Sequence, residues 1–257
     1  MDIKDYIFNL YEIHSSDLIE VRKKQREFIK FVGEHQFDDL EAEILYLLGK
    51  EIKPQITVEV GSLSCWSTSW LLNALRENGV NSLTNQYGHI YSYDIKDSTV
   101  NWASGRYLRE LAGVNDTAHD NPPIRTLTIG DAQSTVNYDA FNDKIVDLLF
   151  VDAIHNTQFH QWALDWLVEP LLNSVKRVPV IFHDVFVNTT KGTDESQVIL
   201  NWLEDNEIEY FTPSNAFETQ FNELNEHREK LSIGIGGNIH PRSEKNSMIL
   251  FFVGGSN

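Results

Sequence analysis

The feature that most constrains this chain is a regular alternation of apolar runs and helical patterns, which begins near Lys53. The apolar runs are Ile56–Val60, His89–Asp94, Ile124–Ile129, Val146–Val151 and Val178–Phe182. The segments with helical spacing between them are Ser67–Glu77, Trp102–Leu111, Ser134–Phe141 and Gln158–Leu172. Such alternation is typical of parallel strands that crossover helices bury on both faces. The sequence therefore predicts a doubly wound α/β fold, whose ligand lies outside the carboxyl ends of the strands.

The segment before this alternation has a different pattern. Residues 1–52 show helical spacing of apolar side chains over Asp17–Val32 and Asp38–Leu48. We interpret them as an N-terminal helical cover on a main domain that comprises residues 53–257.

The segment after the alternation predicts further elements of the same domain. These are a helix at Asp194–Asp205, a strand at Ile208–Thr212 and a terminal strand at Met248–Val253. An insertion at about residues 213–245 lies between the two strands, and a helix is expected in it at Glu218–Lys230. An excursion of this length before a closing strand is uncommon unless it forms a lid or a substrate wall.

Charge and composition disfavour several classes of protein. The 257 residues carry a formal net charge of −17, which repels the phosphate backbone of nucleic acids and anionic membrane surfaces. The basic cluster Arg22–Arg26 lies in an amphipathic segment, and we interpret it as a solvated helix face. The single cysteine, Cys65, excludes an internal disulfide framework. Because the N-terminus is polar and acidic and no apolar run approaches the roughly 20 residues that span a bilayer, we expect a cytoplasmic protein.

The first candidate site is the strand–turn–helix segment Thr57–Thr68. The strand contains Glu59 and is followed by Gly61, where the missing side chain lets the backbone approach a ligand closely. Free amides at the start of the following helix would face the same ligand. Leu63 and Cys65 stand where nucleotide-binding loops often have glycine, so the GxGxxG motif of NAD-binding proteins is missing. A plain strand–helix turn without a ligand is the alternative.

Two further segments follow the next two apolar runs. Asp94 ends the second run, and in doubly wound folds an acid at this place accepts hydrogen bonds from ribose hydroxyls. Asp131 and Ala132 follow the third run, where they either flank a nucleobase or start a helix that Asp131 caps. Adjacent strands would present Asp94 and the glycine turn to one crevice, so the two signals reinforce each other.

The most specific signal is a pair of acids and imidazoles at the ends of the fourth and fifth runs. Asp152 and His155 follow one run, and His183 and Asp184 follow the other. If these strands pair, the two ends lie roughly 5–10 Å apart. Carboxylates suit Mg²⁺, added histidines admit Mn²⁺, Fe²⁺ or Zn²⁺, and an imidazole suits a general base near neutral pH. A hydrogen-bonded cluster that only orders the two loops is the alternative.

Taken in order, these segments resemble the motifs of class I methyltransferases, which use S-adenosylmethionine (SAM). The segments similar to SAM-binding motifs are Val58–Thr68, Tyr93–Asp94 and Gly130–Ala132. The residues that resemble methyltransferase family 24, which is akin to macrocin-type and catechol-type O-methyltransferases, are Asp147–His155, then Asp165, then Phe182–Val185. The resemblance covers about half of the chain, roughly from Ile56 to Phe186.

The resemblance implies a seven-stranded Rossmann-like sheet with a reversed last strand, and it assigns roles to the candidate residues. The residues expected to bind SAM are Glu59, Gly61, Ser62, Ser67, Thr68, Asp94, Asp131 and Ala132. Within this set, Gly61 and its loop would hold the methionine part, Asp94 the ribose, and Asp131 with Ala132 the adenine. The residues expected to hold Mg²⁺ or another divalent metal are Asp152, His183 and Asp184, and the expected catalytic residues are His155 and Asp152.

We therefore expect a SAM-dependent methyltransferase that methylates a hydroxyl of a small-molecule acceptor, with help from a divalent metal and without a nucleic-acid or membrane partner. The N-terminal helices would serve a homodimer. Two alternatives stay open from the sequence. One is a hydroxylase-like or NAD-dependent enzyme on the same sheet, and the other is a non-catalytic module that binds SAM or a partner.

Overall fold

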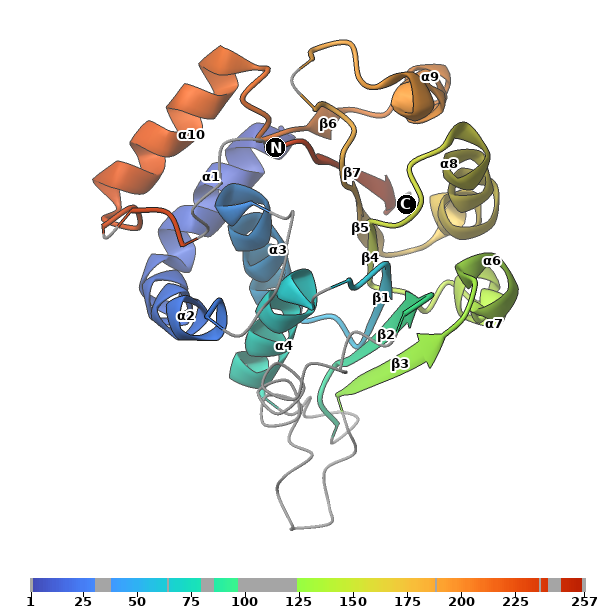
Figure 1. Cartoon of the computed structure of the whole chain (residues 1–257), viewed down its shortest axis with the longest axis horizontal. Coiled ribbons are helices and arrows are strands. Elements are labelled where there is room, and N and C mark those ends of the chain that lie inside the picture. The colour runs from blue at the N-terminus through green and yellow to red at the C-terminus, as the bar shows by residue number, and fades with distance from the viewer. Residues whose placement is uncertain are drawn as a thin grey trace.

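The computed structural model describes most of the chain, namely residues 2–30, 38–63, 65–79, 86–96, 124–187, 189–235, 237–239 and 246–255. Within these residues, seven strands form one sheet between two layers of helices (Figure 1). The helix expected at Trp102–Leu111 lies outside the described residues. Among the helices that are described, none combines the length and the apolar character that crossing a bilayer requires.

The sheet confirms the predicted doubly wound arrangement with a reversed last strand. Its strands are β1 (Ile56–Val60), β2 (His89–Asp94), β3 (Arg125–Ile129), β4 (Leu148–Val151), β5 (Arg177–Phe182), β6 (Tyr210–Phe211) and β7 (Ile249–Gly254). Their order across the sheet is β3-β2-β1-β4-β5-β7-β6. Strands β1 to β5 are parallel, and β7 runs antiparallel to both β5 and β6. The chain order reverses between β1 and β4, where folds of this kind bind their ligands.

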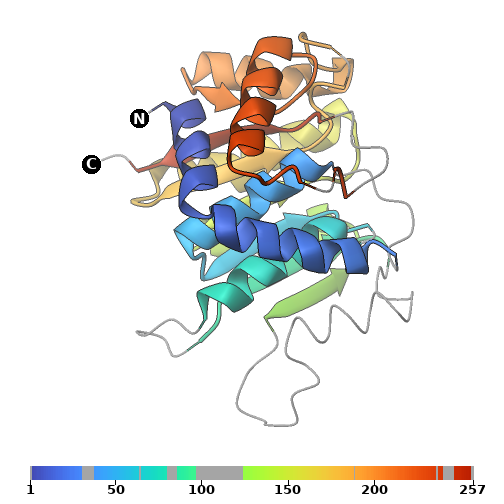
Figure 2. The same ribbon diagram turned by 90° about the vertical axis from the view of Figure 1, so that its left-hand side faces the viewer.

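Helices cover both faces of the sheet (Figure 1). On one face lie α1 (Ile3–Ile13), α2 (Ser15–Phe28), α3 (Asp39–Ile52), α4 (Trp66–Asn78) and α10 (Glu218–Lys230). On the other lie α6 (Ala132–Thr135), α7 (Tyr138–Asn142), α8 (Thr157–Ala163) and α9 (Gln197–Asp205). Helix α10, predicted with the same bounds, lies beside α1 in Figure 2, so the insertion packs against the N-terminal helices.

Two expected helices are interrupted. The segment expected as one helix at Gln158–Leu172 begins as α8, continues as a π-helical turn at Leu164–Val168 and ends as a 3₁₀ turn at Glu169–Asn173. Pro170 explains the change, because proline lacks the amide hydrogen and its ring collides with the carbonyl one turn earlier.

The segment expected as one helix at Ser134–Phe141 is divided into α6 and α7. Asn137 lies between them in an extended conformation, and its side chain accepts a hydrogen bond from the amide of Asp139 at 3.2 Å. A side chain that caps a new helix in this way competes with continuation of the earlier one.

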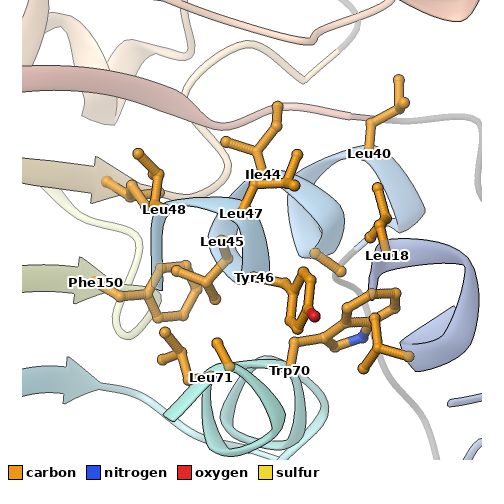
Figure 3. Close-up of a cluster of buried hydrophobic side chains, with 14 of the residues drawn as sticks. Leu18, Leu40, Ile44, Leu45, Tyr46, Leu47, Leu48, Trp70, Leu71 and Phe150 are labelled. Carbon is orange, nitrogen blue, oxygen red and sulfur yellow. The ribbon is translucent and has the colours of Figure 1, made fainter. Parts of the chain in front are cut away.

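The N-terminal helices share a hydrophobic core with the sheet. Figure 3 shows side chains of α3 between α4 and the strands, with Leu45 beside Phe150 of β4 and Tyr46 beside Trp70 of α4. All four side chains are buried. Burial of apolar surface contributes about 25 cal/mol for each Å², so these buried side chains stabilise the packing of α3 against the sheet.

A buried group of charges attaches α2 and α10 to α3. The carboxylate of Glu43 accepts hydrogen bonds from the guanidinium groups of Arg22 and Arg228 and from the hydroxyl of Tyr11. The interpretation of Arg22–Arg26 as a solvated helix face is therefore wrong for Arg22, which is buried against Glu43. Burial alone would raise the pKa of Glu43, but the charges of Arg228 and Arg22 outweigh it and lower this pKa.

Candidate active site

A cavity of about 350 Å³ opens at the carboxyl ends of β1, β2, β3 and β4. Its walls are formed by residues 60–63, 66–67, 93–96, 130–132 and 152–155, together with Phe159. The cavity has the location that the strand order predicts and a volume in the range of small-molecule sites. The predicted site residues that line it are Gly61, Ser62, Ser67, Asp94, Asp131, Ala132, Asp152 and His155.

Gly61 is required at its position by both conformation and space. Its φ of +86° lies in the region that side chains disfavour, and a Cβ atom there would lie 1.7 Å from the carbonyl oxygen of Asp152. The loop after β1 thus lies directly against the backbone that follows β4. Leu63 and Cys65, which stand where related loops have glycine, also adopt positive φ values of 35° and 63°.

Asp94 holds the glycine loop in place. Its Oδ2 accepts hydrogen bonds from the amides of Ser62 and Leu63, both at 2.8 Å, and its Oδ1 accepts one from the amide of Lys96 at 3.0 Å. The hydroxyl of Ser62 also donates to Oδ2 at 3.2 Å. Among the described residues Oδ1 accepts only the hydrogen bond from Lys96, so this oxygen retains an acceptor position for a ligand hydroxyl. The acid at the end of β2 therefore shapes the cavity wall as well as lining it.

Asp131 and Ala132 form the wall beside β3. The side chain of Asp131 caps α6 by accepting a hydrogen bond from the amide of Gln133 at 3.0 Å. Asp131 therefore starts a helix, and because it also lines the cavity, its contact with a nucleobase stays a prediction.

Glu59 and Thr68 lie elsewhere than expected. Glu59 is fully buried, and its carboxylate accepts hydrogen bonds from the hydroxyls of Ser67, Thr68 and Ser92 at 2.6–2.9 Å. Neither Glu59 nor Thr68 is among the described residues that line the cavity. They join β1, β2 and α4, so the expectation that Glu59 and Thr68 contact the ligand has no support in this geometry.

Asp152, His155 and Asp184 form an acidic end of the site. The Nε2 atom of His155 lies 3.4 Å from Oδ2 of Asp184 and 3.9 Å from Oδ1 of Asp152. One ligand atom from each residue lies within 4.8 Å of the others. Two carboxylate oxygens and one imidazole nitrogen at this spacing fit a divalent cation.

His183 lies behind this group. Its side chain is 1% exposed, with Nδ1 3.2 Å from Oδ1 of Asp152 and Nε2 3.2 Å from Oε2 of Glu41. Because both ring nitrogens face carboxylates, the expectation that His183 ligates a metal does not agree with the structure. His155 takes that place in the group.

The charges of this cluster stabilise one another. Burial alone would lower the pKa of His183, but Asp152 and Glu41 outweigh it and raise this pKa well above its usual value. Burial would likewise raise the pKa of Asp184, but the hydrogen bond and charge of His183 lower it to about 2. His183 is thus held as an imidazolium at neutral pH, and Asp184 is ionised.

A match to a known protein family identifies the kind of enzyme that has this site. Residues 58–185, about half of the chain, match the model of a methyltransferase domain family, Methyltransf_24. The chain belongs to this family of class I SAM-dependent methyltransferases. The match spans the glycine loop, Asp94, Asp131 and the acidic end of the cavity. No curated protein sequence matches this methyltransferase significantly.

Solved structures share the fold of this methyltransferase across nearly its whole length. A protein from Staphylococcus aureus that carries the name caffeoyl-CoA O-methyltransferase is 14% identical with a TM-score of 0.51, covering 98% of this chain and 99% of its own. Cofactor-bound Rv0187 from MTB is 14% identical with a TM-score of 0.50, covering 94% and 91%. These likenesses establish the fold of the methyltransferase, including its N-terminal helices.

The residue that sequence reasoning missed is Glu41 of this methyltransferase. It lies on α3, outside the matched region, and contacts His183 across 142 positions of sequence. Its only local signal is the capping box that it forms with Asp38, which predicts a helix start and no part in a site.

Proposed function

We propose that this methyltransferase transfers a methyl group from SAM to a hydroxyl of a small molecule. The observation that carries the proposal is that Asp152 and His155 line the same cavity as Gly61 and Asp94. A loop suited to the cofactor thus adjoins groups that bind and deprotonate a hydroxyl. The O-methyltransferase name of the Staphylococcus aureus neighbour supports oxygen as the acceptor atom.

The described residues fit SAM. Gly61 leaves room for a ligand against the backbone, and Trp66 and Ser67 at the start of α4 line the cavity. Oδ1 of Asp94 retains an acceptor position for a ribose hydroxyl, and Asp131 with Ala132 offers a wall for the adenine. Bound SAM supplies an electrophilic methyl group on its sulfonium.

The residues at the acidic end take up the proton that the reaction releases. A bond forms between the acceptor oxygen and the methyl carbon while the carbon–sulfur bond breaks, and S-adenosylhomocysteine leaves. The hydroxyl proton passes to Nε2 of His155, where the nearby carboxylate of Asp184 stabilises the imidazolium. Holding the hydroxyl in line with the methyl group contributes the remaining rate enhancement.

We propose Asp152, His155 and Asp184 as the ligands of a divalent ion that assists the reaction. The imidazole among the ligands favours Mn²⁺, Fe²⁺ or Zn²⁺ over Mg²⁺. A bound ion would lower the pKa of the acceptor hydroxyl, and His155 would then be a ligand instead of the base.

Transfer of the labelled methyl group of SAM to a panel of phenols, catechols, sugars and amines tests the proposal. We expect methylated hydroxyls and a loss of at least about 100-fold in kcat for His155→Ala. Activity that survives EDTA supports His155 as the base, whereas activity lost in EDTA and restored by Mn²⁺ supports the ion. Methylation of amines alone would contradict the choice of oxygen.

The charge of the chain bears on the class of acceptor. A net charge of −17 favours small molecules over nucleic acids as acceptors. The cytoplasmic location and the homodimer through the N-terminal helices stay predictions, and light scattering on the purified chain tests the second. SAM binding without transfer to any acceptor in a broad panel would favour a non-catalytic module, and hydroxylated products would favour a hydroxylase.

A further inference from the structure

We propose that Glu41 is a positioning residue for the active site, which holds the carboxylates of Asp152 and Asp184 in place through His183 and Ser247. The inference rests on the proposed function, because it assigns Glu41 to the acceptor end of that site. Glu41 lies on α3, so the N-terminal helices take part in the site as well as in covering the sheet.

The position of Glu41 is set by backbone donors. Its Oε1 accepts hydrogen bonds from the amides of Ser247 at 2.5 Å and Met248 at 2.7 Å, where β7 begins. Its Oε2 accepts one from the amide of Asp38 at 3.0 Å and lies 3.2 Å from Nε2 of His183. The side chain is fully buried, and a buried carboxylate with this many donors has one stable position.

The first route from Glu41 to the site runs through His183. Carboxylates only accept hydrogen bonds, so the imidazole donates from Nε2 to Glu41 and from Nδ1 toward Asp152 at 3.2 Å and Asp184 at 3.4 Å. The partner on one nitrogen of a histidine fixes the orientation of its ring and of the group on the other nitrogen. Glu41 therefore fixes the orientation of Asp152, which lines the cavity.

The second route runs through Ser247. Its amide is held by Glu41, and its hydroxyl donates a hydrogen bond to Oδ1 of Asp184 at 2.9 Å. Both carboxylates of the acidic end are thus connected to one side chain on α3. A displacement of about 1 Å in such groups is enough to reduce a rate substantially.

Glu43 provides a matched control on the same helix. It is also fully buried, two residues further along the chain, but its partners are Arg22, Arg228 and Tyr11. A change there disturbs the attachment of α2 and α10 and leaves the partners of His183 in place.

The test compares Glu41→Gln with Glu43→Gln in the full chain by kinetics and by nitrogen–proton NMR of the histidines. We expect Glu41→Gln to lower kcat by about 10-fold to 100-fold, with the affinity for S-adenosylhomocysteine changed by less than about 3-fold. The Nε2 proton signal of His183, assigned by its loss in His183→Asn, shifts in Glu41→Gln. Glu43→Gln lowers the unfolding temperature and leaves that signal and kcat unchanged.

Two results would contradict the role of Glu41 as a positioning residue. An unchanged His183 signal in a folded Glu41→Gln protein, or an unchanged kcat, overturns the inference. If Glu41→Gln does not fold, the wild-type spectrum decides, because the inference requires a slowly exchanging Nε2 proton on His183 and its absence contradicts it. If the wild-type protein methylates no hydroxyl acceptor, the proposed function fails, and the NMR comparison still tests the contact of Glu41 with His183.

Discussion

The two ends of the active-site cavity are built in different ways. At the cofactor end, Gly61, Ser62 and Asp94 come from two adjacent strands and are joined by hydrogen bonds to the backbone of one loop. At the acceptor end, Asp152 and Asp184 are held by the side chains of His183 and Ser247. His183 in turn contacts Glu41 of α3, which lies 142 positions earlier in the sequence. The cofactor end should therefore be most sensitive to changes in the backbone, and the acceptor end to changes in side-chain polarity.

The largest effect is expected at the cofactor end, from Gly61→Ala. The added Cβ meets the carbonyl oxygen of Asp152 at 1.7 Å at a φ of +86°. We expect the free energy of unfolding to fall by about 3 kcal/mol or more, with no measurable binding of S-adenosylhomocysteine. Chemical denaturation and calorimetry measure the two effects.

Gly79→Ala is the matched control for this substitution. Gly79 also has a positive φ, of +73°, but a Cβ there has no heavy atom within 4 Å among the described residues. We expect a loss of about 1 kcal/mol from the conformation alone and unchanged cofactor binding. Equal losses in the two variants would show that the close approach of the loop to Asp152 is unimportant.

The next largest effect is expected at the acceptor end, from Asp152→Asn. Asp152→Asn keeps an oxygen that accepts from His183 but removes a charge from the cavity wall. We expect kcat to fall by about 100-fold, with the affinity for S-adenosylhomocysteine nearly unchanged. Asp165→Asn, at an exposed acid that bonds Gln161, should leave both quantities unchanged. A large loss of cofactor affinity in Asp152→Asn would mean that the two ends are not separate.

An intermediate effect is expected for Asp94→Ala. The change removes the acceptor of the Ser62 and Leu63 amides, so the loop loses its main polar contact with β2. We expect cofactor affinity to fall by about 10-fold to 50-fold, and kcat at saturating SAM to change less. Asp165→Asn is again the control, because this exposed acid is not among the described residues that line the cavity. A drop in kcat alone for Asp94→Ala, with cofactor affinity unchanged, would show that this acid acts at the acceptor end instead of the cofactor end.

The smallest effect concerns acid stability. The pKa of Asp184 is lowered to about 2 in the folded protein, so its contribution is present above the ordinary value of 3.8 and is lost as the pH falls toward 2. About 2 kcal/mol of unfolding free energy should disappear over that interval. Asp184→Asn should make the pH dependence between 4 and 2 shallower, as measured by denaturation at several pH values. An identical pH profile in the variant would contradict the role assigned to His183.

The same difference between the two ends explains what the sequence allowed us to predict. The order of apolar runs predicted the parallel strands and the location of the cavity, because buried parallel strands are read as continuous apolar segments. The reversed last strand was implied by the family resemblance. Gly61 and Asp94 were predicted because each ends or follows such a run. The interruption of the helix before Pro170 was also visible in the sequence and was overlooked.

The acceptor end was predicted less well, because its geometry depends on contacts between distant segments. The four residues at the ends of β4 and β5 were identified, but which histidine faces the cavity depends on the partner of His183. That partner, Glu41, appears in the sequence only as the third residue of a helix.

Titration calorimetry of the wild-type chain with S-adenosylhomocysteine tests the central claim most directly. The cavity beside Gly61 and Asp94 predicts one site per chain, with a dissociation constant of roughly 1–100 µM and binding abolished in Gly61→Ala. No heat of binding with either S-adenosylhomocysteine or SAM at millimolar concentration would contradict the assignment of this cavity to the cofactor.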